Sequence, residues 1–317
     1  MVNGTGGGDD TLSRFIAPHL GRVLGADILV ESRGGAAGVI GVRAIRDAIP
    51  DGLTLGLINA AGFVAPILAG DRTVPNPTTD LTVLCRISRS RHVWAARMDS
   101  PLRSMQDVLK LSRERPVVFP ISDLGAVAFI SATLTSNLLD LPVKLVAGYE
   151  GSRSGVLAAL RGEVDLISYN LESIIENIRN RDIRPLLQIS DKPLSGDPAF
   201  ENVPLLGGPD GMAAAHAGSI HHDVEAAKTE ATAIAALLGA GRIVVGPPRM
   251  NRDLSVCLTN KLKQVLASPD LLSVAEAANV SLDVADGGTA LAEFADLDQK
   301  SRKFIPIIQS AIERLRQ

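Results

Sequence analysis

Two hydrophobic periods alternate along the first 60 residues. Over residues 11–24 the apolar side chains recur every three to four positions, which predicts an amphipathic helix. Short apolar runs predict strands at residues 28–30 and 53–58, and the glycine-rich segment 34–41 between them leads into a helix that ends near residue 48. Because strands and helices alternate here, we expect a mostly parallel sheet.

A longer α/β series follows. Helical spacing predicts helices at residues 102–114, 125–139, 152–161 and 171–180, and Ser104 is a good N-cap for the first of them. Apolar runs predict strands at residues 81–87, 92–97, 116–120, 143–146, 164–168 and 183–189. This series is long enough to form a sheet of its own.

The last third of the chain is mainly helical. Residues 192–211 are rich in Pro, Gly and Asp and predict a surface connection. The spacing then predicts one strand at residues 242–245 and helices at residues 222–238, 253–266, 269–278 and 288–315.

Two α/β series joined by extended crossings indicate two lobes. We expect the first lobe to comprise residues 1–98 and 192–317, and the second residues 99–191. The predicted class is α/β, with mixed, mostly parallel sheets flanked by helices and a ligand cleft between the lobes. In open α/β sheets the ligand lies beyond the carboxyl ends of the strands. The loops expected there are residues 6–10, 59–62, 121–125, 149–154 and 169–171.

The composition of the chain narrows the range of possible functions. A chain of 317 residues suits two domains. Its net charge of -3 argues against a basic surface for nucleic acid. Aromatic residues make up only 3% of the chain, so few side chains are available to stack on nucleic-acid bases. Cys85 and Cys257 have no metal or redox spacing, so we expect both to be buried as small apolar residues.

Three local patterns could carry other chemistry. Residues 34–41 follow a predicted strand and open a helix, as in a dinucleotide-binding loop, but lack strict Gly-x-Gly-x-x-Gly spacing. The serines of Gly151–Gly155 miss the middle position of a nucleophile elbow. His216, His221, His222 and Asp223 could be interpreted as a metal cluster, but they have no regular ligand spacing and fit a solvated loop better. We therefore predict no cofactor, no metal ion and no catalytic residue.

Five motifs, in order along the chain, resemble one family: the substrate-binding receptors of tripartite tricarboxylate transporters, also called Bug receptors. The motifs are GGGDDTLSR at residues 6–14, VESRGGAAGVIG at residues 30–41, PDGLTL at residues 50–55, GYEGSRSGVLAALRGEVDL at residues 148–166 and VGPP at residues 245–248. Each motif alone is weak, but their order and spacing cover most of the chain. The resemblance implies a two-lobed periplasmic-binding-protein-like fold of type II.

The resemblance also implies a role for the predicted loops. It assigns carboxylate binding, partly through ordered water, to the first glycine loop, where free helix N–H groups favour an anion. Asp123 suits an N-cap better than a ligand contact, and Arg153 could be either a carboxylate partner or a solvated helix residue. The predicted ligand-binding residues are Gly7, Gly8, Asp9, Asp10, Asn59, Ala60, Ala61, Ser122, Asp123, Gly125, Tyr149, Glu150, Ser152, Arg153, Tyr169 and Asn170.

The resemblance therefore implies a periplasmic, monomeric receptor and not an enzyme. It would capture a mono-, di- or tricarboxylate, bind no nucleic acid and dock on membrane transporter subunits. The chain departs from the family in several places: residues 1–10 lack the basic start and apolar centre of a signal peptide, the family's first strand is not seen, and residues 212–241 look longer than usual. The alternatives are a cytoplasmic enzyme or sensor on the same fold, and a truncated non-functional paralogue.

Overall fold

The computed structural model describes residues 8–33, 38–76, 78–193, 197–219, 223–277 and 280–316. By its internal contacts the chain divides into two compact units. Unit 1 comprises residues 1–67, 71–90 and 240–299, and unit 2 comprises residues 68–70, 91–239 and 300–317. Residues 91–98, 192–239 and 300–317, which we expected in the first lobe, group with unit 2.

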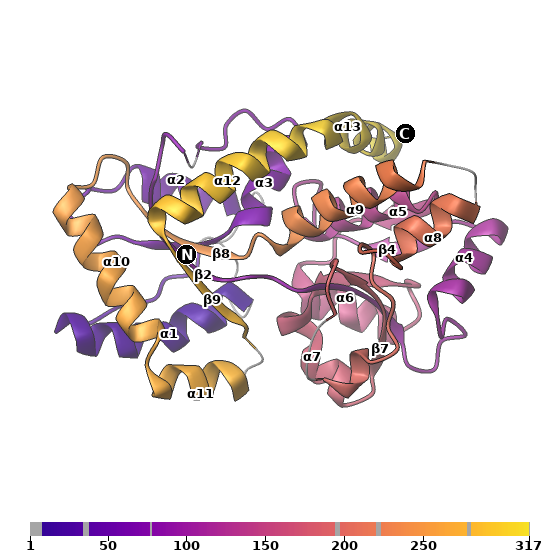
Figure 1. The fold of residues 1–317 in the computed structure, drawn as a ribbon, viewed down its shortest axis with the longest axis horizontal. Coiled ribbons are helices and arrows are strands. Elements are labelled where there is room, and N and C mark those ends of the chain that lie inside the picture. The colour runs from indigo at the N-terminus through magenta and orange to yellow at the C-terminus, as the bar shows by residue number, and fades with distance from the viewer. Residues whose placement is uncertain are drawn as a thin grey trace. The chain divides into compact units, whose positions relative to one another are not determined.

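Unit 1 contains a four-stranded sheet in the order β1-β8-β2-β9. Its strands are β1 (Gly56–Asn59), β8 (Arg242–Gly246), β2 (Thr82–Ser88) and β9 (Leu282–Asp286). Its helices are α1 (Gly8–Leu24), α2 (Val39–Arg46), α3 (Ala60–Leu68), α10 (Arg252–Leu266), α11 (Pro269–Ala277) and α12 (Gly287–Ser301). Helices α1 and α10 pack against each other and contact the sheet, as Figure 1 shows. Their apolar faces close the core of this unit around β2 and β8.

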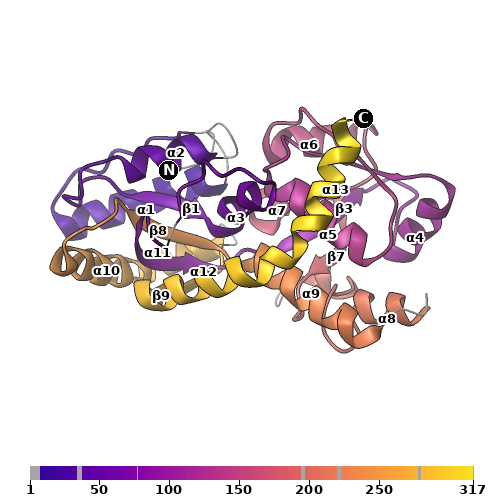
Figure 2. The same ribbon diagram turned by 90° about the horizontal axis from the view of Figure 1, so that it is seen from above.

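Unit 2 contains a three-stranded sheet in the order β6-β3-β7 and a separate pair, β4 and β5. Its strands are β3 (His92–Arg97), β4 (Val117–Pro120), β5 (Val143–Val146), β6 (Ile167–Asn170) and β7 (Ile183–Ile189). Its helices are α4 (Met105–Glu114), α5 (Val127–Leu138), α6 (Gly151–Leu160), α7 (Leu171–Arg179), α8 (Met212–Ser219), α9 (Val224–Gly239) and α13 (Ile305–Arg316). Helix α5 lies between α9 and α13 (Figure 2) and is buried along almost its whole length, which explains its lack of a polar face.

The expected strand direction is wrong. Among the described strands only β4 and β5 pair in parallel, while the other pairs in both units are antiparallel. The cause in unit 1 is β8, which inserts between β1 and β2 and runs against both of them. The strand expected at residues 28–30 is not formed, because these residues are irregular.

Residues 26–31 instead form one wall of a hollow in unit 1. The hollow has a volume of about 640 Å³ and is bounded mainly by apolar side chains from α1, β1 and α10. Leu29 and Leu53 lie at its rim and are 84% and 86% exposed.

No helix within the described ranges is long and apolar enough to cross a bilayer.

Candidate functional site

Helix α1 begins at Gly8, so Asp9 and Asp10 lie in its first turn. Asp9 Oδ1 accepts a hydrogen bond of 2.6 Å from Arg242 Nε, and both side chains are only 2% exposed. Asp10 pairs with Arg14 one turn later, at 3.0 Å. Both carboxylates therefore bind arginines of the protein itself and also suit the positive end of the helix. Gly7 lies outside the described residues.

The turn expected after β1 is the start of a helix. Asn59 ends β1, and its Oδ1 accepts a 3.2 Å hydrogen bond from Gly62 N, which makes it a cap for α3. Ala60 and Ala61 are buried in the first turn, where Ala60 N donates to Gly241 O at 2.9 Å. The expectation of a loop at residues 59–62 is wrong because α3 is apolar on all sides and shows no helical period.

Arg242 joins these parts of unit 1. It opens β8 opposite both Asn59 of β1 and Ser88 of β2. Gly241, just before it, has φ +79, and a side chain there would collide with the backbone of Ser88. Sequence reasoning missed Arg242, although an arginine at the head of an apolar strand needs a buried acidic partner.

Three loops of unit 2 are tied together by hydrogen bonds, two of them between backbone groups and one from a tyrosine hydroxyl. Ile121 N donates to Val146 O at 2.8 Å, and Tyr149 N donates to Ile121 O at 3.1 Å. The hydroxyl of Tyr169 donates to Gly151 O at 3.4 Å, which links β6 to the start of α6. These bonds link the loops that carry the second set of predicted residues, which are Ser122, Asp123, Gly125, Tyr149, Glu150, Ser152, Arg153, Tyr169 and Asn170.

The helices that begin at these loops lack side-chain caps. The N-cap residues of α5, α6 and α7 are Ala126, Glu150 and Asn170, and none accepts a hydrogen bond from its own helix. By contrast, Ser104 caps α4 and Asn251 caps α10. Side-chain caps thus take up none of the first N–H groups of α5, α6 and α7, although Leu171 N of α7 donates to the backbone oxygen of Arg91 at 2.6 Å.

Asp123 is not the N-cap we expected. Its Oδ1 accepts a 2.8 Å hydrogen bond from Gly125 N and closes a turn two residues before α5 begins. Glu150 and Arg153 are exposed, while Ser122 and Ser152 are half-buried. The small hydroxyls, not the long charged side chains, are therefore the protected polar groups of these loops.

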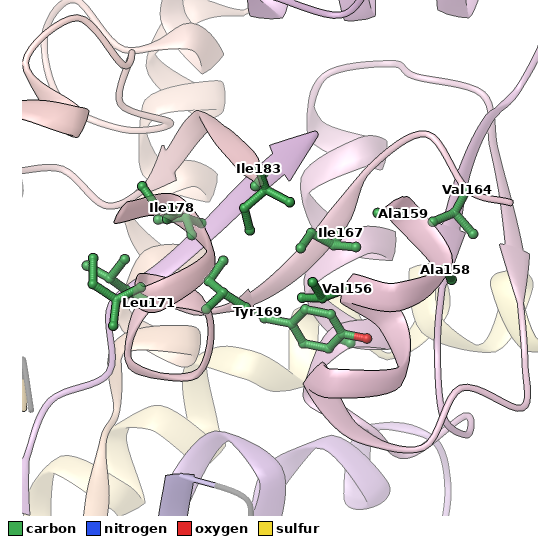
Figure 3. Close-up of a cluster of buried hydrophobic side chains, with 14 of the residues drawn as sticks. Val156, Ala158, Ala159, Val164, Ile167, Tyr169, Leu171, Ile178 and Ile183 are labelled. Carbon is green, nitrogen blue, oxygen red and sulfur yellow. The ribbon is translucent and has the colours of Figure 1, made fainter. Parts of the chain in front are cut away.

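Tyr169 belongs mainly to the core of unit 2. Figure 3 shows its ring beside Val156 of α6, within the cluster of buried apolar residues. Burial raises the pKa of its hydroxyl above the ordinary value. At Gly155 a side chain would overlap the tyrosine ring, so the glycine allows α6 to approach β6.

A buried polar network ends at Asn170. His92 Nδ1 lies 2.9 Å from Asn170 Oδ1, His92 Nε2 lies 3.2 Å from Ser168 Oγ, and Ser168 Oγ lies 2.7 Å from Ser131 Oγ. Burial lowers the pKa of His92 to about 4, against the opposing effect of the bond to Asn170. His92 is therefore neutral at neutral pH, and sequence reasoning gave it no role.

The described residues hold no group of three or more His, Cys, Asp or Glu side chains suited to a metal ion. Asp223 caps α9 through hydrogen bonds from Glu225 N and Ala226 N, while His221 and His222 lie outside the described residues. Cys85 is buried as expected, but Cys257 is exposed, so that part of the expectation is wrong.

Comparisons with known proteins agree with the motifs. The sequence pattern of the tripartite tricarboxylate transporter family receptor, TctC, matches residues 12–237. Protein BugT of Bordetella pertussis is 29% identical over 214 residues, which cover 66% of this chain and 64% of BugT. A protein encoded in the tcbD-tcbE intergenic region of a Pseudomonas strain is 28% identical over 208 residues, which cover 63% of this chain and 59% of that protein. The chain thus matches slightly less than two thirds of the length of either relative.

Solved structures show the same fold at lower identity. The periplasmic binding protein BugD is 18% identical with a TM-score of 0.76, over 96% of this chain and 95% of BugD. MatC of Rhodopseudomonas palustris, solved with malate, is 17% identical with a TM-score of 0.75 over 96% of both chains. A second R. palustris protein, solved with adipate, is 21% identical with a TM-score of 0.73, over 95% of this chain and 94% of that protein. These likenesses confirm the expected periplasmic-binding-protein fold, and the match over residues 12–237 shows that the chain belongs to the family of tripartite tricarboxylate transporter receptors.

Proposed function

We propose that this protein is a periplasmic receptor that binds a small organic carboxylate and delivers it to the membrane subunits of a tripartite tricarboxylate-type transporter. The observation that carries the proposal is the set of three helix N-termini, of α5, α6 and α7, that begin at mutually bonded loops without side-chain caps. Free N–H groups and the partial positive charge of a helix end both favour a carboxylate.

The side chains around these helix ends support the same ligand class. The half-buried hydroxyls of Ser122 and Ser152 and the amide of Asn170 can donate hydrogen bonds to carboxylate oxygens. Family membership supports it independently, as do structural neighbours solved with malate and adipate. Family membership alone supports delivery to a transporter and a periplasmic location.

The buried serine–histidine pair does not favour an enzyme. Ser168 and His92 lie within hydrogen-bond distance, as in a nucleophilic pair, but their side chains are 2% and 3% exposed. A nucleophile buried to this extent cannot meet a substrate, so the pair supports no hydrolytic function.

The experiment is calorimetric titration of the purified protein with malate, succinate, adipate, citrate and benzoate, with ATP and glucose as controls. We expect saturable binding of at least one carboxylate and none of the controls. A protein that unfolds cooperatively but binds no carboxylate would contradict the proposal.

A charge substitution tests where the carboxylate binds. Ser152→Asp places a negative charge in the first turn of α6, where it suits the helix but repels an anionic ligand. We expect its carboxylate affinity to fall about tenfold or more, with no loss of thermal stability. Ala226→Asp is the matched control, because it adds the same charge to the exposed first turn of α9. Equal effects of the two substitutions on affinity would place the ligand elsewhere.

A further inference from the structure

Asn170 is a helix N-cap residue whose side chain does not cap. It has the extended backbone of an N-cap, with φ -63 and ψ 138, and asparagine is among the best capping residues. Yet its side chain makes no hydrogen bond to α7. Its amide oxygen lies instead 2.9 Å from His92 Nδ1 on the neighbouring strand, β3. The strand pairing thus keeps this oxygen away from the helix end.

With the Asn170 amide oxygen facing His92, the chemistry of the four side chains favours one direction for each hydrogen bond. An amide oxygen can only accept, so His92 Nδ1 must carry the proton and donate it to Asn170. Neutral His92 then accepts at Nε2, and the donor is the Ser168 hydroxyl at 3.2 Å. The Ser168 oxygen accepts in turn from the hydroxyl of Ser131 on α5, at 2.7 Å. The network therefore runs in one direction, from Ser131 through Ser168 and His92 to Asn170.

This direction decides what Asn170 presents to a ligand. Its oxygen is engaged inward, and the half-buried side chain keeps its NH2 group as a donor at the N-terminus of α7. We propose that His92 is a positioning residue: it holds Asn170 as a hydrogen-bond donor to a carboxylate oxygen of the ligand and keeps the Asn170 oxygen off the N–H groups at the start of α7. This inference rests on the proposed function and adds a determinant of anion selectivity to it.

Without His92, the orientation of the Asn170 amide and the capping of α7 would change together. The Asn170 amide could turn its oxygen onto the N–H groups of α7, as asparagine does at ordinary N-caps. The helix end would then lose donors, and an acceptor oxygen would face the ligand. A carboxylate would meet this oxygen as a repulsive neighbour.

Three variants separate positioning from simple packing. His92→Asn keeps an N–H donor near the Nδ1 position and can still hold Asn170, whereas His92→Leu keeps the bulk and removes the donor. Asn170→Asp replaces the NH2 donor by an acceptor. We expect carboxylate affinity to stay within about threefold in His92→Asn and to fall by roughly tenfold to a hundredfold in the other two. The melting temperature of each ligand-free variant is measured alongside, and Ser168→Ala, which removes the donor to Nε2, replaces His92→Leu if that variant does not fold.

Nitrogen NMR of the ligand-free wild type tests the network without any variant. We expect His92 to be the neutral tautomer with its proton on Nδ1, and the Asn170 NH2 resonances to shift when a carboxylate binds. A proton on Nε2 would overturn the inference, as would wild-type affinity in His92→Leu or equal losses in His92→Asn and His92→Leu. If the wild type binds no carboxylate at all, the proposed function fails and the inference fails with it. If the wild type binds a carboxylate and His92→Leu and Asn170→Asp bind it equally well, the inference alone is overturned.

Discussion

The ion pair between Asp9 and Arg242 shows how a single contact shapes unit 1. The two residues are 233 positions apart and almost completely buried. Burying two charges costs several kcal/mol, which a short, well-directed hydrogen bond offsets only while both partners are present. The pair therefore holds the first turn of α1 against the head of β8.

Removing one partner should cost far more than removing both. Arg242→Met leaves Asp9 as a buried charge without its arginine, and we expect the free energy of unfolding to fall by about 3–5 kcal/mol. The double variant Asp9→Leu with Arg242→Met replaces the pair by apolar groups and should recover most of this loss. Urea unfolding followed by circular dichroism measures both variants. A double variant as unstable as the single one would show that the cost arises from packing and not from the loss of the ion pair.

Local sequence patterns could not reveal the Asp9–Arg242 ion pair or the His92–Asn170 hydrogen bond. The glycine–aspartate start of α1 was visible in the sequence, and so were Asn59, Ser122 and Asn170 as polar residues after strands. Their partners were not, because the partners of Asp9 and Asn170 come from residues 233 and 78 positions away. Pairing at that distance depends on the strand register, and a one-sequence pattern does not contain the register.

At the scale of elements, helices and strands with a strong hydrophobic period were predicted correctly, and those with a weak period were not. The predicted bounds of β3, β5 and β7 agree with the structure, and Ser104 caps α4 as expected. Helix α3 was missed because it is apolar on every side, and β9 because its edge position exposes charged residues. Residues 28–30 have the composition of a strand, but a strand needs a partner, and none lies beside them within the described ranges.

The contact between α6 and β6 leads to a prediction for one glycine. Gly155→Ala would force a methyl group into the ring of Tyr169, so we expect it to destabilise the protein by about 1–3 kcal/mol, although alanine favours helix elsewhere. Ser154→Ala in the same helix is the control and should change stability by less than about 0.5 kcal/mol. Thermal unfolding measures both. If Gly155→Ala were as stable as the wild type, the close packing of α6 on Tyr169 would be wrong.

At the scale of the whole molecule, the hollow in unit 1 leaves apolar surface in contact with water. Leu29 and Leu53 are among the most exposed large apolar side chains of the described residues, and both border the same hollow. Contiguous apolar surface of this kind promotes association.

The hollow should therefore bind an apolar dye under native conditions. We expect the fluorescence of anilinonaphthalene sulfonate to rise with wild-type protein and to fall by about half or more in the double variant Leu29→Ser with Leu53→Ser. Leu157→Ser is the control, since Leu157 is exposed on α6 in unit 2. Equal dye binding by all three proteins would place the apolar surface elsewhere.

The position of β8 has a consequence for the order in which the protein can assemble during synthesis. Strands β3, β6 and β7 of unit 2 are all present once residue 189 has been made. The sheet of unit 1 cannot form until later, because β8 lies between β1 and β2 and begins only at Arg242. Until then the edges of β1 and β2 that face β8 have no partner, although both strands were made more than 150 residues earlier. The ribosome thus completes the strands of unit 2 before the sheet of unit 1 can form. A nascent chain halted at Gly239 would contain the paired strands of unit 2 and, in unit 1, the strands β1 and β2 without their partner β8.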